Sequence, residues 1–440
     1  MTYPVYSEYE DSGAEWLGKI PRHWSVLPLK RKYRIVGGST PPAGDENWNG
    51  DIVWVTPADL SQLANFDIVD SKRKISETGL HSCGVSLVAK GSIVLSTRAP
   101  IGSLGIAKLS LTTNQGCKAL VPTGPVCSRF HAYQLSTLKK ELNVRGRGST
   151  FMELSREELG VVSITFPPVE EQQKIAAFLD RKTAEIDTLI AKKRRLLDRL
   201  AEKRTALITR AVTKGLNPDA PMKDSGIEWL GEIPAHWEVR RLKQLIAEPF
   251  KNGIFKKKEH WGAGTPIINV GDLYSGNEVN ADRLDRLECS EEEKRKYDSS
   301  IGDFFFVRSS LKLDGIGKSA SLLKKIEPTV FECHIVRGRP MTELVEPRFL
   351  SFVLNSTYAR AWFVAAANTV TMATIDQSKV KELVIGLPNY SEQEQIADFI
   401  ELSMHRLDHV SGRVCSVVEA LQEYRSALIT NAVTGQIKVA

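Results

Sequence analysis

PPVEEQQKIAAFLD begins at Pro167, and the stretch that it opens runs without a further proline or glycine to RTALITRAVT, which ends at Thr213. Its apolar residues recur at the spacing of one helix face. The two prolines and Glu170 suit a helix start, and Gly215 and Pro218 suit a stop. At ~1.5 Å per residue, the stretch predicts a helical rod of roughly 65 Å. A small domain does not need so long a helix, so we expect a spacer.

The same rod pattern returns 221 residues later, since Glu171 of the first copy matches Glu392 of the second. The ALIT sequence at 206–209 likewise matches ALIT at 427–430. In the second copy, apolar residues from Leu407 to Leu428 alternate at intervals of three and four, which is typical of a coiled-coil seam. We expect the two rods to lie antiparallel, so that each covers the apolar seam of the other.

A second repeat precedes each rod. Residues 11–30 read DSGAEWLGKIPRHWSVLPLK and residues 224–243 read DSGIEWLGEIPAHWEVRRLK, and we call both the tryptophan motif. Internal repeats outrank other local signals in a sequence. The chain is therefore predicted to run as unit, rod, unit, rod. The predicted segments are an N-terminal domain (1–166), the first helix (167–215), a C-terminal domain (216–386), and the second helix with its tail (387–440).

Each unit holds mixed strand and helix signals between its tryptophan motif and its rod. Strands are predicted at 52–55, 91–95, 118–121 and 162–166, and at 265–270, 304–307, 334–336 and 383–387. Helices are predicted at 129–141 and 347–366. The expected fold class is α/β (α+β): two similar globular domains separated by two long antiparallel coiled-coil helices, in a pseudo-twofold, circular arrangement.

Composition bounds the function only loosely. The chain has 440 residues, 25% of them charged, and a net charge of +6, which permits a polyanionic partner. The six cysteines show no spacing typical of a zinc site, and we expect reduced thiols in the cytoplasm. No apolar run is long enough to span a membrane, and the acidic N-terminus is not typical of a signal peptide.

With these motifs the chain resembles the specificity subunit of type I restriction–modification enzymes, from Glu15 to Gln436. The features that carry the resemblance are the doubled EWLG-x-IP-x-HW, the doubled rod start with its EQ and IA-x-F, and the doubled ALIT-x-AVT. The resemblance implies two target-recognition domains, each reading one half of a split double-stranded DNA site. It also implies helices that set the spacing and bind two methyltransferase (modification) subunits, which motor-nuclease restriction subunits join. S-adenosylmethionine, ATP and Mg are then expected in the partner subunits, and no cofactor or metal in this chain.

Catalytic motifs are weak in this sequence. Gly317-Lys318-Ser319 ends like a phosphate-binding loop, but Lys312 stands where that motif needs glycine. Asp59 with Asp70-Ser71-Lys72 only loosely resembles a nuclease carboxylate set. We therefore predict a non-catalytic subunit. Two alternatives stay open: a stand-alone nuclease or methyltransferase, and a protein-only coiled-coil scaffold without specific DNA binding.

Basic and polar residues at strand ends and in glycine-rich loops are the candidate DNA contacts, because Arg, Asn and Gln read base edges and Lys binds phosphate. The loop 142–150 (LNVRGRGST) is the foremost, and Arg308 is expected to correspond to Arg98. The predicted DNA-binding residues are Arg98, Asn114, Gln115, Arg145, Arg147, Thr150, Lys256, Lys257, Arg308, Ser309, Lys312, Lys318, Asn368 and Thr371.

The rods and the tryptophan motif are assigned to assembly. The predicted partner-binding and spacer-helix residues are Ile175, Phe178, Leu189, Leu200, Leu207, Ile396, Phe399, Val410, Leu421 and Leu428. The tryptophans 16, 24, 229 and 237 could stack on bases, but large aromatics mostly serve packing. We expect them to fix each motif to the ends of the rods.

Overall fold

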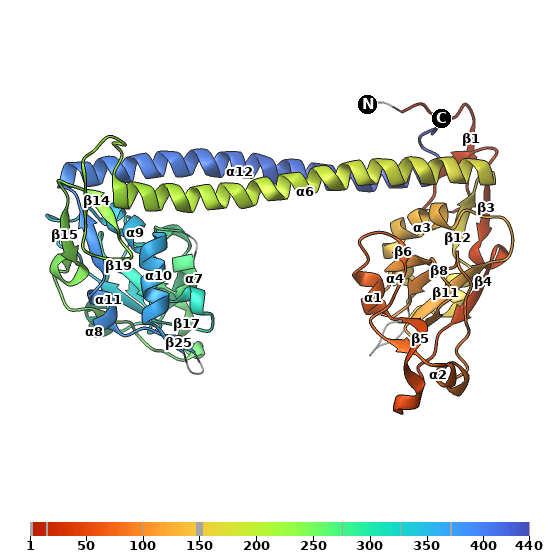
Figure 1. Cartoon of the computed structure of the whole chain (residues 1–440), viewed down its shortest axis with the longest axis horizontal. Coiled ribbons are helices and arrows are strands. Elements are labelled where there is room, and N and C mark those ends of the chain that lie inside the picture. Colours follow the sequence, from red (N-terminus) through yellow and green to blue (C-terminus); the bar gives the residue numbers. More distant parts are fainter. Residues whose placement is uncertain are drawn as a thin grey trace. The chain divides into compact units, whose positions relative to one another are not determined.

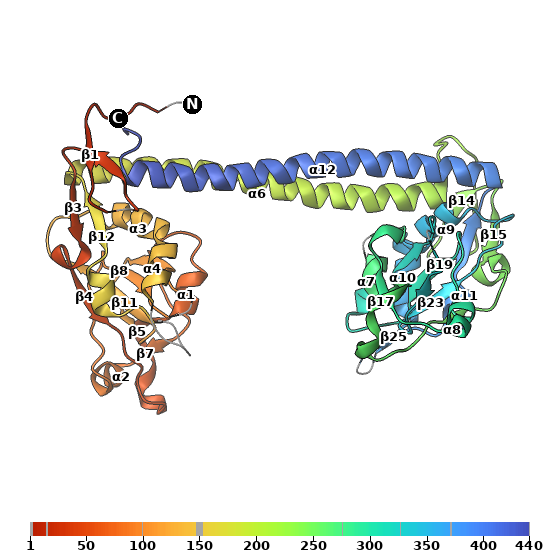
Figure 2. The ribbon, with the colours of Figure 1, turned by 180° about the vertical axis from the view of Figure 1, so that it is seen from behind.

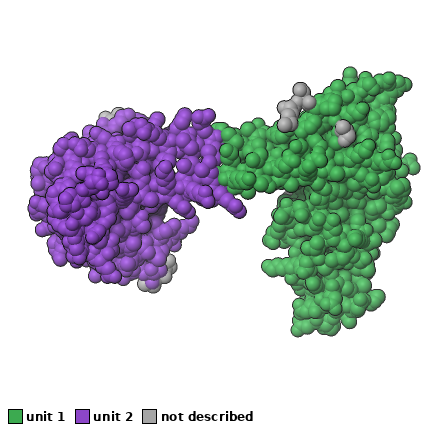
Figure 3. All heavy atoms as spheres, turned by 45° about the horizontal axis from the view of Figure 1, so that its top comes forward, with its two compact units in different colours: residues 1–194, 416–440 green, residues 195–415 purple. Residues whose placement is uncertain are grey.

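The chain forms two compact units in the computed structural model, which describes residues 3–14, 16–98, 100–146, 153–274, 276–325, 327–369 and 372–439. Unit 1 comprises residues 1–194 and 416–440, and unit 2 comprises residues 195–415 (Figure 3). Each unit thus takes a part of both long helices. This division differs from the predicted segments because the apolar face of each helix packs on the globule beside it.

Unit 1 is built around a five-stranded mixed sheet of order β4-β11-β8-β9-β6 (Figure 1). A three-stranded sheet β10-β5-β7 adjoins it, in which β10 pairs parallel to β5. Two-stranded pairs β1-β2 and β12-β3 complete the unit. The strands are β1 (Tyr9–Asp11), β2 (Lys19–Pro21), β3 (Ser25–Pro28), β4 (Tyr33–Gly37), β5 (Trp48–Val55), β6 (Asp67–Ile68), β7 (Lys74–Ile75), β8 (Ile93–Ser96), β9 (Leu104–Ala107), β10 (Thr112–Thr113), β11 (Cys117–Pro122) and β12 (Ser163–Phe166).

Short helices cover this sheet. They are α1 (Pro57–Ser61), α2 (Glu77–Ser82), α3 (Ser128–Thr137), α4 (Lys139–Arg145) and α5 (Arg156–Gly160). Thr56 and Asp59 form a capping box at α1, and Ser155 caps α5. The core between α3 and the sheet buries Leu95, Leu120 and Leu135 completely.

Unit 2 repeats this plan, with a four-stranded sheet β16-β23-β19-β21 and a sheet β18-β17-β22 in which β22 pairs parallel to β17 (Figure 2). Smaller sheets are β13-β14, β15-β26 and β20-β25-β24. The strands are β13 (Met222–Asp224), β14 (Glu232–Pro234), β15 (Glu238–Arg241), β16 (Lys251–Asn252), β17 (Trp261–Ile268), β18 (Asp285–Leu287), β19 (Phe304–Val307), β20 (Ser309–Ser310), β21 (Ser319–Ser321), β22 (Val330–Phe331), β23 (Ile335–Gly338), β24 (Asn368–Thr369), β25 (Ala373–Thr374) and β26 (Val384–Leu387).

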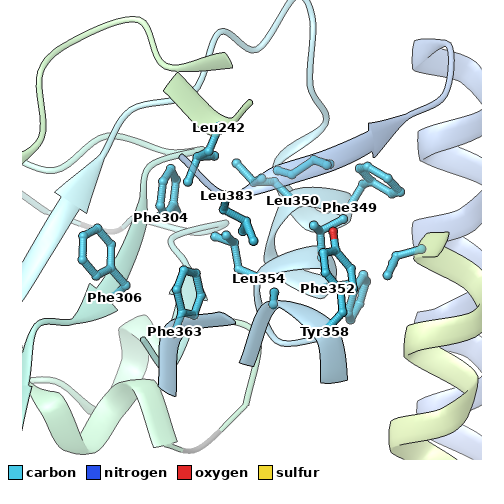
Figure 4. Packing of buried hydrophobic residues seen from close by; sticks show 14 of the residues in the cluster. Leu242, Phe304, Phe306, Phe349, Leu350, Phe352, Leu354, Tyr358, Phe363 and Leu383 are labelled. Carbon is cyan, nitrogen blue, oxygen red and sulfur yellow. The ribbon is translucent and has the colours of Figure 1, made fainter. Parts of the chain in front are cut away.

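The helices of unit 2 enclose an aromatic core. They are α7 (Val270–Tyr274), α8 (Glu291–Lys296), α9 (Pro347–Leu354), α10 (Thr357–Ala366) and α11 (Gln377–Lys381). Phe304 and Phe306 of β19 belong to one buried cluster with Phe349 of α9 and Phe363 of α10 (Figure 4). Ile208 and Ile396 belong to the same buried cluster, so the long helices are part of this core.

The two long helices are α6 (Val169–Lys214) and α12 (Tyr390–Val433). They run antiparallel inside each unit. In unit 1, Asp187 pairs with Arg425 while Thr165, just before α6, donates a hydrogen bond to Val433 O. In unit 2, Arg204 pairs with Asp408. The predicted fold class, two α/β globules with two long helices, is confirmed.

Both ends of the chain belong to unit 1. Lys438 N donates to Pro4 O at 2.7 Å, and the Tyr9 hydroxyl donates to Gly435 O at 2.9 Å. The predicted circular arrangement requires the two ends to meet in this way. Among the described residues, no helix combines the length and the apolar character that a membrane crossing needs.

Candidate nucleic-acid interface

A carboxylate in the first turn of each long helix holds the tryptophan motif. Trp24 Nε1 and His23 Nε2 donate to the two oxygens of Glu171, at 3.2 and 2.9 Å, and the Tyr6 hydroxyl also donates to Glu171. In unit 2, Trp237 Nε1 and His236 Nε2 make the same bonds to Glu392, at 3.1 and 2.8 Å. The prediction that the tryptophans fix the motif to the helix ends is confirmed for these two.

The other two tryptophans of the motif do not contact the carboxylates. Trp229 is exposed and stacks on Trp362, with ring centroids 4.8 Å apart. Trp16 is half-buried at the edge of the unit 1 core. The glutamine that follows each carboxylate locks the adjoining loop: Gln172 accepts from Cys127 N, and Gln393 accepts from Glu346 N, both at 2.8 Å.

A common backbone framework lies at the strand ends of each unit. Gly38 passes so near the turn after β10 that a Cβ there would lie 2.0 Å from Asn114 O. Gly253 repeats this approach, with a Cβ 2.1 Å from Glu332 O. Only glycine allows such contact of two backbones. The turn itself is fixed by matching bonds, Asn114 N to Val55 O at 2.9 Å and Glu332 N to Ile268 O at 3.0 Å.

The aspartate beside this turn is a capping residue in both units. Asp59 accepts from Thr56 N at 2.8 Å and from Lys72 N at 3.0 Å, and Asp272 accepts from Asn269 N at 2.7 Å. The carboxylate of Asp59, which loosely resembled part of a nuclease set, therefore stabilises the start of α1.

The expected correspondence between Arg98 and Arg308 is wrong by one residue. Thr97 N donates to Gly116 O at 2.8 Å, and Arg308 N donates to His334 O at 2.9 Å. Thr97 O accepts from Leu154 N at 2.8 Å, and Arg308 O accepts from Ile375 N at 2.9 Å. Arg308 therefore occupies the position of Thr97. By the same register Ser309 occupies the position of Arg98, so the two frameworks present different side chains there.

In unit 1, Arg98 belongs to a charged cluster at the end of β8. Its Nε donates to Glu153 at 2.9 Å. The buried Lys118 donates to Glu153 at 3.3 Å, to Thr97 Oγ1 at 3.2 Å and to Leu154 O at 2.8 Å. Burial raises the pKa of Glu153, but the bonds from Arg98 and Lys118 outweigh it and hold that pKa below its ordinary value. Nη1 and Nη2 of Arg98 make no bond to a described residue.

Asn114 and Gln115 lie in the tight turn that the sequence predicted. Asn114 Oδ1 accepts from Gly116 N at 3.0 Å, which is an Asx turn. The Thr40 hydroxyl donates to Gln115 Oε1, and Gln115 is exposed. An exposed amide on a fixed turn can reach a base edge.

The glycine-rich loop 142–150 is shorter than predicted, because α4 continues to Arg145. Arg145 Nε donates to Glu141 at 2.7 Å, one helical turn earlier, and its Nη1 lies 3.8 Å from Glu158. The KELNVR sequence favours helix, which explains the difference. Arg147, Thr150 and Thr371 lie outside the described residues, so their assignment stays a prediction.

Unit 2 presents a cluster of three polar side chains from separate segments. Asn252 Oδ1 accepts from Arg308 Nη1 at 2.9 Å and from Gln377 Nε2 at 2.8 Å. Ser309 Oγ shares a hydrogen bond of 2.6 Å with His334 Nδ1. Sequence reasoning missed Asn252 and Gln377, although the Asn252-Gly253 turn was visible in the sequence. Only the fold brings Gln377 of α11 to that turn.

The predicted lysines differ in exposure and in whether the protein already supplies hydrogen-bond partners for their ammonium groups. Lys256 donates to Glu288 O at 2.6 Å and to Glu293 at 2.8 Å, so it already holds the start of α8. Lys257 and Lys312 are exposed, as is Asn368 in β24. Lys312 adjoins an open hollow of about 590 Å³ that Tyr274, Ser309 and Leu311 also line.

Three consecutive residues near this hollow have metal-ligating side chains. The ligand atoms of Glu332, Cys333 and His334 lie within 4.8 Å of one another. Glu332 Oε1 accepts from Val270 N at 3.1 Å, and His334 Nδ1 is bonded to Ser309. Two of the three groups thus already have protein partners, and we assign no metal to them.

The predicted partner-binding residues of the long helices divide into two sets. Ile175, Phe178, Ile396 and Leu428 are buried within their own units, and Leu200, Leu207 and Leu421 are half-buried. These seven serve mainly to pack the helices. Leu189, Phe399 and Val410 are exposed by 46%, 43% and 43%, and so remain open to a partner.

Comparison with known proteins gives a consistent result. The family model of the type I restriction modification DNA specificity domain matches residues 21–198 and 234–404. The type I restriction enzyme MjaIX specificity subunit of Methanocaldococcus jannaschii is 35% identical over 59% of this chain and 60% of its own length. The type I restriction enzyme EcoKI specificity subunit of Escherichia coli K12 is 23% identical over 96% of this chain and 90% of its own length.

Solved structures share the fold. A chain from a type I R-M system, solved in a study of complex assembly and conformational transition, superposes with a TM-score of 0.72 at 14% identity, covering 94% of this chain and 98% of that one. The HsdS subunit from Thermoanaerobacter tengcongensis gives a TM-score of 0.54 at 14% identity, covering 95% and 98%. Since the family model matches both units and well over half of the residues, the chain belongs to the family of type I restriction–modification specificity subunits.

Proposed function

We propose that each unit reads one half of a bipartite double-stranded DNA site for a type I restriction–modification complex. Membership of the family makes this chain the DNA-recognising specificity subunit and not an enzyme. The observation that carries the two-half proposal is the pair of matching frameworks. Matching backbone bonds hold Thr97 in unit 1 and Arg308 in unit 2, so that Arg98 follows the held position in unit 1 and Ser309 follows it in unit 2. A shared frame with different side chains suits two different half-sites.

The proposed base and phosphate contacts follow from the chemistry of exposed and half-exposed side chains. Arg98 and Arg308 each have guanidinium donors that bond to no described residue. A guanidinium can donate twice to O6 and N7 of guanine in the major groove. Gln115 and Gln377 carry the amides that suit adenine. Lys257, Lys312 and Lys318 supply phosphate contacts, which fix register and give a steep dependence on salt.

The long helices are proposed to set the spacing between half-sites and to bind the partner subunits. α6 is one uninterrupted helix from Val169 to Lys214, which supports a role as a fixed-length strut. Leu189, Phe399 and Val410 are exposed apolar residues on the helices, and we assign them to contacts with two methyltransferase subunits. Restriction subunits with motor and nuclease activity join that assembly. S-adenosylmethionine, ATP and Mg belong to those partners, and the complex acts in the cytoplasm, where its DNA lies.

Co-expression with the modification subunits and sequencing of methylated bases tests the proposal. The expected motif has two specific parts and an unread gap. Inserting four helix-forming residues after Ala191 lengthens α6 by ~6 Å. At ~3.4 Å per base pair, the gap should grow by about two pairs while both halves stay unchanged. A contiguous motif, or an insertion that alters the bases read, would contradict the proposal.

A further inference from the structure

Residues 3–6, here called the strap, lie against α6 in unit 1. The ring of Tyr3 meets the ring of Phe178 edge to face, with the two centroids 5.5 Å apart. The strap is also tied to the end of the chain, because Lys438 N donates to Pro4 O at 2.7 Å. Phe178 is exposed by only 9%. The strap therefore covers an aromatic side chain of the long helix.

The strap also reaches α12 within unit 1. A side-chain hydrogen bond to Tyr424 raises the pKa of Tyr3 to about 12, and the charges of Glu185 and Arg181 act on the same hydroxyl. Tyr3 thus lies over three positions of α6 and one position of α12. We call these four positions the strap site: Phe178, Arg181, Glu185 and Tyr424.

The repeat of 221 residues places a corresponding face on unit 2, which we call the open face. The register on α6 follows from the next residue along, since Arg204 and Arg425 form equivalent ion pairs between the helices. The members of the open face are Phe399, Leu402 and Arg406 on α12 and Lys203 on α6, at the positions of Phe178, Arg181, Glu185 and Tyr424.

The open face has no strap over it. Phe399 is exposed by 43%, against 9% for Phe178, and Leu402 is exposed by 53%. In unit 2 residues 215–221 link the end of α6 to β13, and Leu216 in this link is itself exposed. One duplicated helix sequence thus presents a covered face in unit 1 and an uncovered face in unit 2.

The side chains of the open face indicate the chemistry of its partner. Phe399 and Leu402 are three positions apart and Arg406 follows four positions later, so all three lie on one side of α12. Arg406 and Lys203 are exposed, and neither forms an ion pair with a described residue. An exposed apolar patch beside unpaired cations suits a protein surface that offers an apolar side chain and a carboxylate.

We propose that the strap blocks one of two corresponding docking faces, so that a first modification subunit binds the open face and a second binds unit 1 only when residues 3–6 leave Phe178. This rests on the proposed function, which assigns two methyltransferase subunits to the long helices without distinguishing them. The fraction of chains whose strap is detached multiplies the intrinsic affinity of the covered face. The second subunit therefore binds more weakly than the first.

Titration of the full chain with its modification subunit, without DNA, tests the proposal by calorimetry or sedimentation. The wild type should give two unequal dissociation constants. Tyr3→Ala should tighten only the weaker site, by roughly 2- to 10-fold, which is the contribution of one aromatic pair. Phe399→Ala should weaken only the tighter site. Val5→Ala is the matched control, because Val5 lies in the strap, is exposed and should leave both constants unchanged.

A second variant at the same position separates the two contacts of the strap. Tyr3→Phe keeps the ring on Phe178 and loses only the hydrogen bond to Tyr424, so it should tighten the weaker site less than Tyr3→Ala does. Two equal constants in the wild type, or a weaker site that Tyr3→Ala leaves unchanged or weakens further, would overturn the proposal.

The same titration distinguishes this proposal from the proposed function. Two equal constants would remove the blocking role of the strap and leave the docking of modification subunits standing. If the modification subunit does not bind the chain at all, both fail. Self-association of the chain alone that Phe399→Ala abolishes would assign the open face to a second copy of this chain and would also overturn the proposal.

Discussion

Arg425 donates from Nε and Nη2 to the two carboxylate oxygens of Asp187, at 2.9 and 3.2 Å. Arg204 and Asp408 repeat the contact in unit 2 at 2.8 Å, with the acid and the base exchanged between the helices. The sequence repeat of 221 residues places an acid and an arginine on each helix. Antiparallel packing then converts one duplicated sequence into two equivalent ion pairs.

This pairing predicts a small, measurable coupling. Arg425→Ala and Asp187→Ala should each lower stability slightly, and a double-mutant cycle by urea unfolding should give a coupling of about 0.2–1 kcal/mol, as for other exposed pairs. Asp187→Arg combined with Arg425→Asp should recover most of the wild-type stability. The Arg204–Asp408 pair serves as the control and should give a similar coupling. Additive single effects at both pairs would contradict the account of helix pairing.

Glu171 is predicted to be the critical residue of the contact between the tryptophan motif and α6. Glu171→Ala leaves the indole N–H of Trp24 and the Tyr6 hydroxyl without their acceptor. Such unpaired groups cost about 1–3 kcal/mol, which thermal or urea unfolding can measure. Glu392→Ala should cost a similar amount in unit 2. Glu170→Ala is the control, because Glu170 is an exposed neighbour in the same turn. Equal effects of the variants at 170 and 171 would show that only the helix dipole matters.

The ion pairs of Glu248 are predicted to make the stability of unit 2 sensitive to acid. It lies 2.8 Å from both Arg337 and Arg339. Burial raises the pKa of Glu248, but the two guanidiniums outweigh it and hold the pKa below the ordinary value. A depressed pKa in the folded state stabilises the protein above the ordinary pKa, and this stability is lost as the pH falls through the folded value.

Glu248→Gln should therefore lower Tm at neutral pH and flatten the loss of Tm below the ordinary pKa of 4.5. Melting curves across the acid range provide the measurement, and exposed Glu343→Gln provides the control. If the Tm of Glu248→Gln falls with decreasing pH as steeply as that of the wild type, the acid sensitivity comes from other groups.

Arg308 is predicted to read a base, with Asn252 as its positioning residue. A good bidentate contact discriminates against the wrong base by about 1–3 kcal/mol, or roughly 5- to 150-fold. Arg308→Ala should relax one position in the half-site of unit 2. Asn252→Ala should relax the same position more weakly, since the guanidinium loses the acceptor that orients it. Methylation sequencing gives the readout, with exposed Arg240→Ala as the control. Weaker binding with an unchanged motif would make Arg308 a phosphate contact.

The large elements could be predicted from the sequence because they follow from periodicity. The periodicity predicts the first helix at 167–215, and α6 spans Val169–Lys214. The strand expected at 304–307 is β19. The EQ and HW pairs could be matched by inspection, but their mutual contact, between Glu171 and Trp24, depends on the fold bringing residues 147 positions apart together.

The candidate DNA contacts at the strand ends were harder to predict. The hydrogen-bond register between neighbouring strands decides which residue occupies each of these positions. A shift of one residue separates the Arg98–Arg308 match from the true match of Thr97 with Arg308, and only hydrogen bonds to a neighbouring strand fix that choice. Lys256 looked free in a run of three lysines, whereas the fold places Glu293 beside it. Arg145 precedes two glycines in the sequence, a pattern typical of a loop, whereas the structure continues α4 as far as Arg145. Ion pairs between distant segments leave no local pattern in a sequence.

The central claim is that the two units read separate half-sites independently. Replacing residues 31–165 with those of another family member, co-expressing the chimaera with the modification subunits and sequencing the methylated bases tests it most directly. The account predicts a motif in which one half is exchanged while the other half and the gap stay as before. A motif changed in both halves, or in neither, would contradict it.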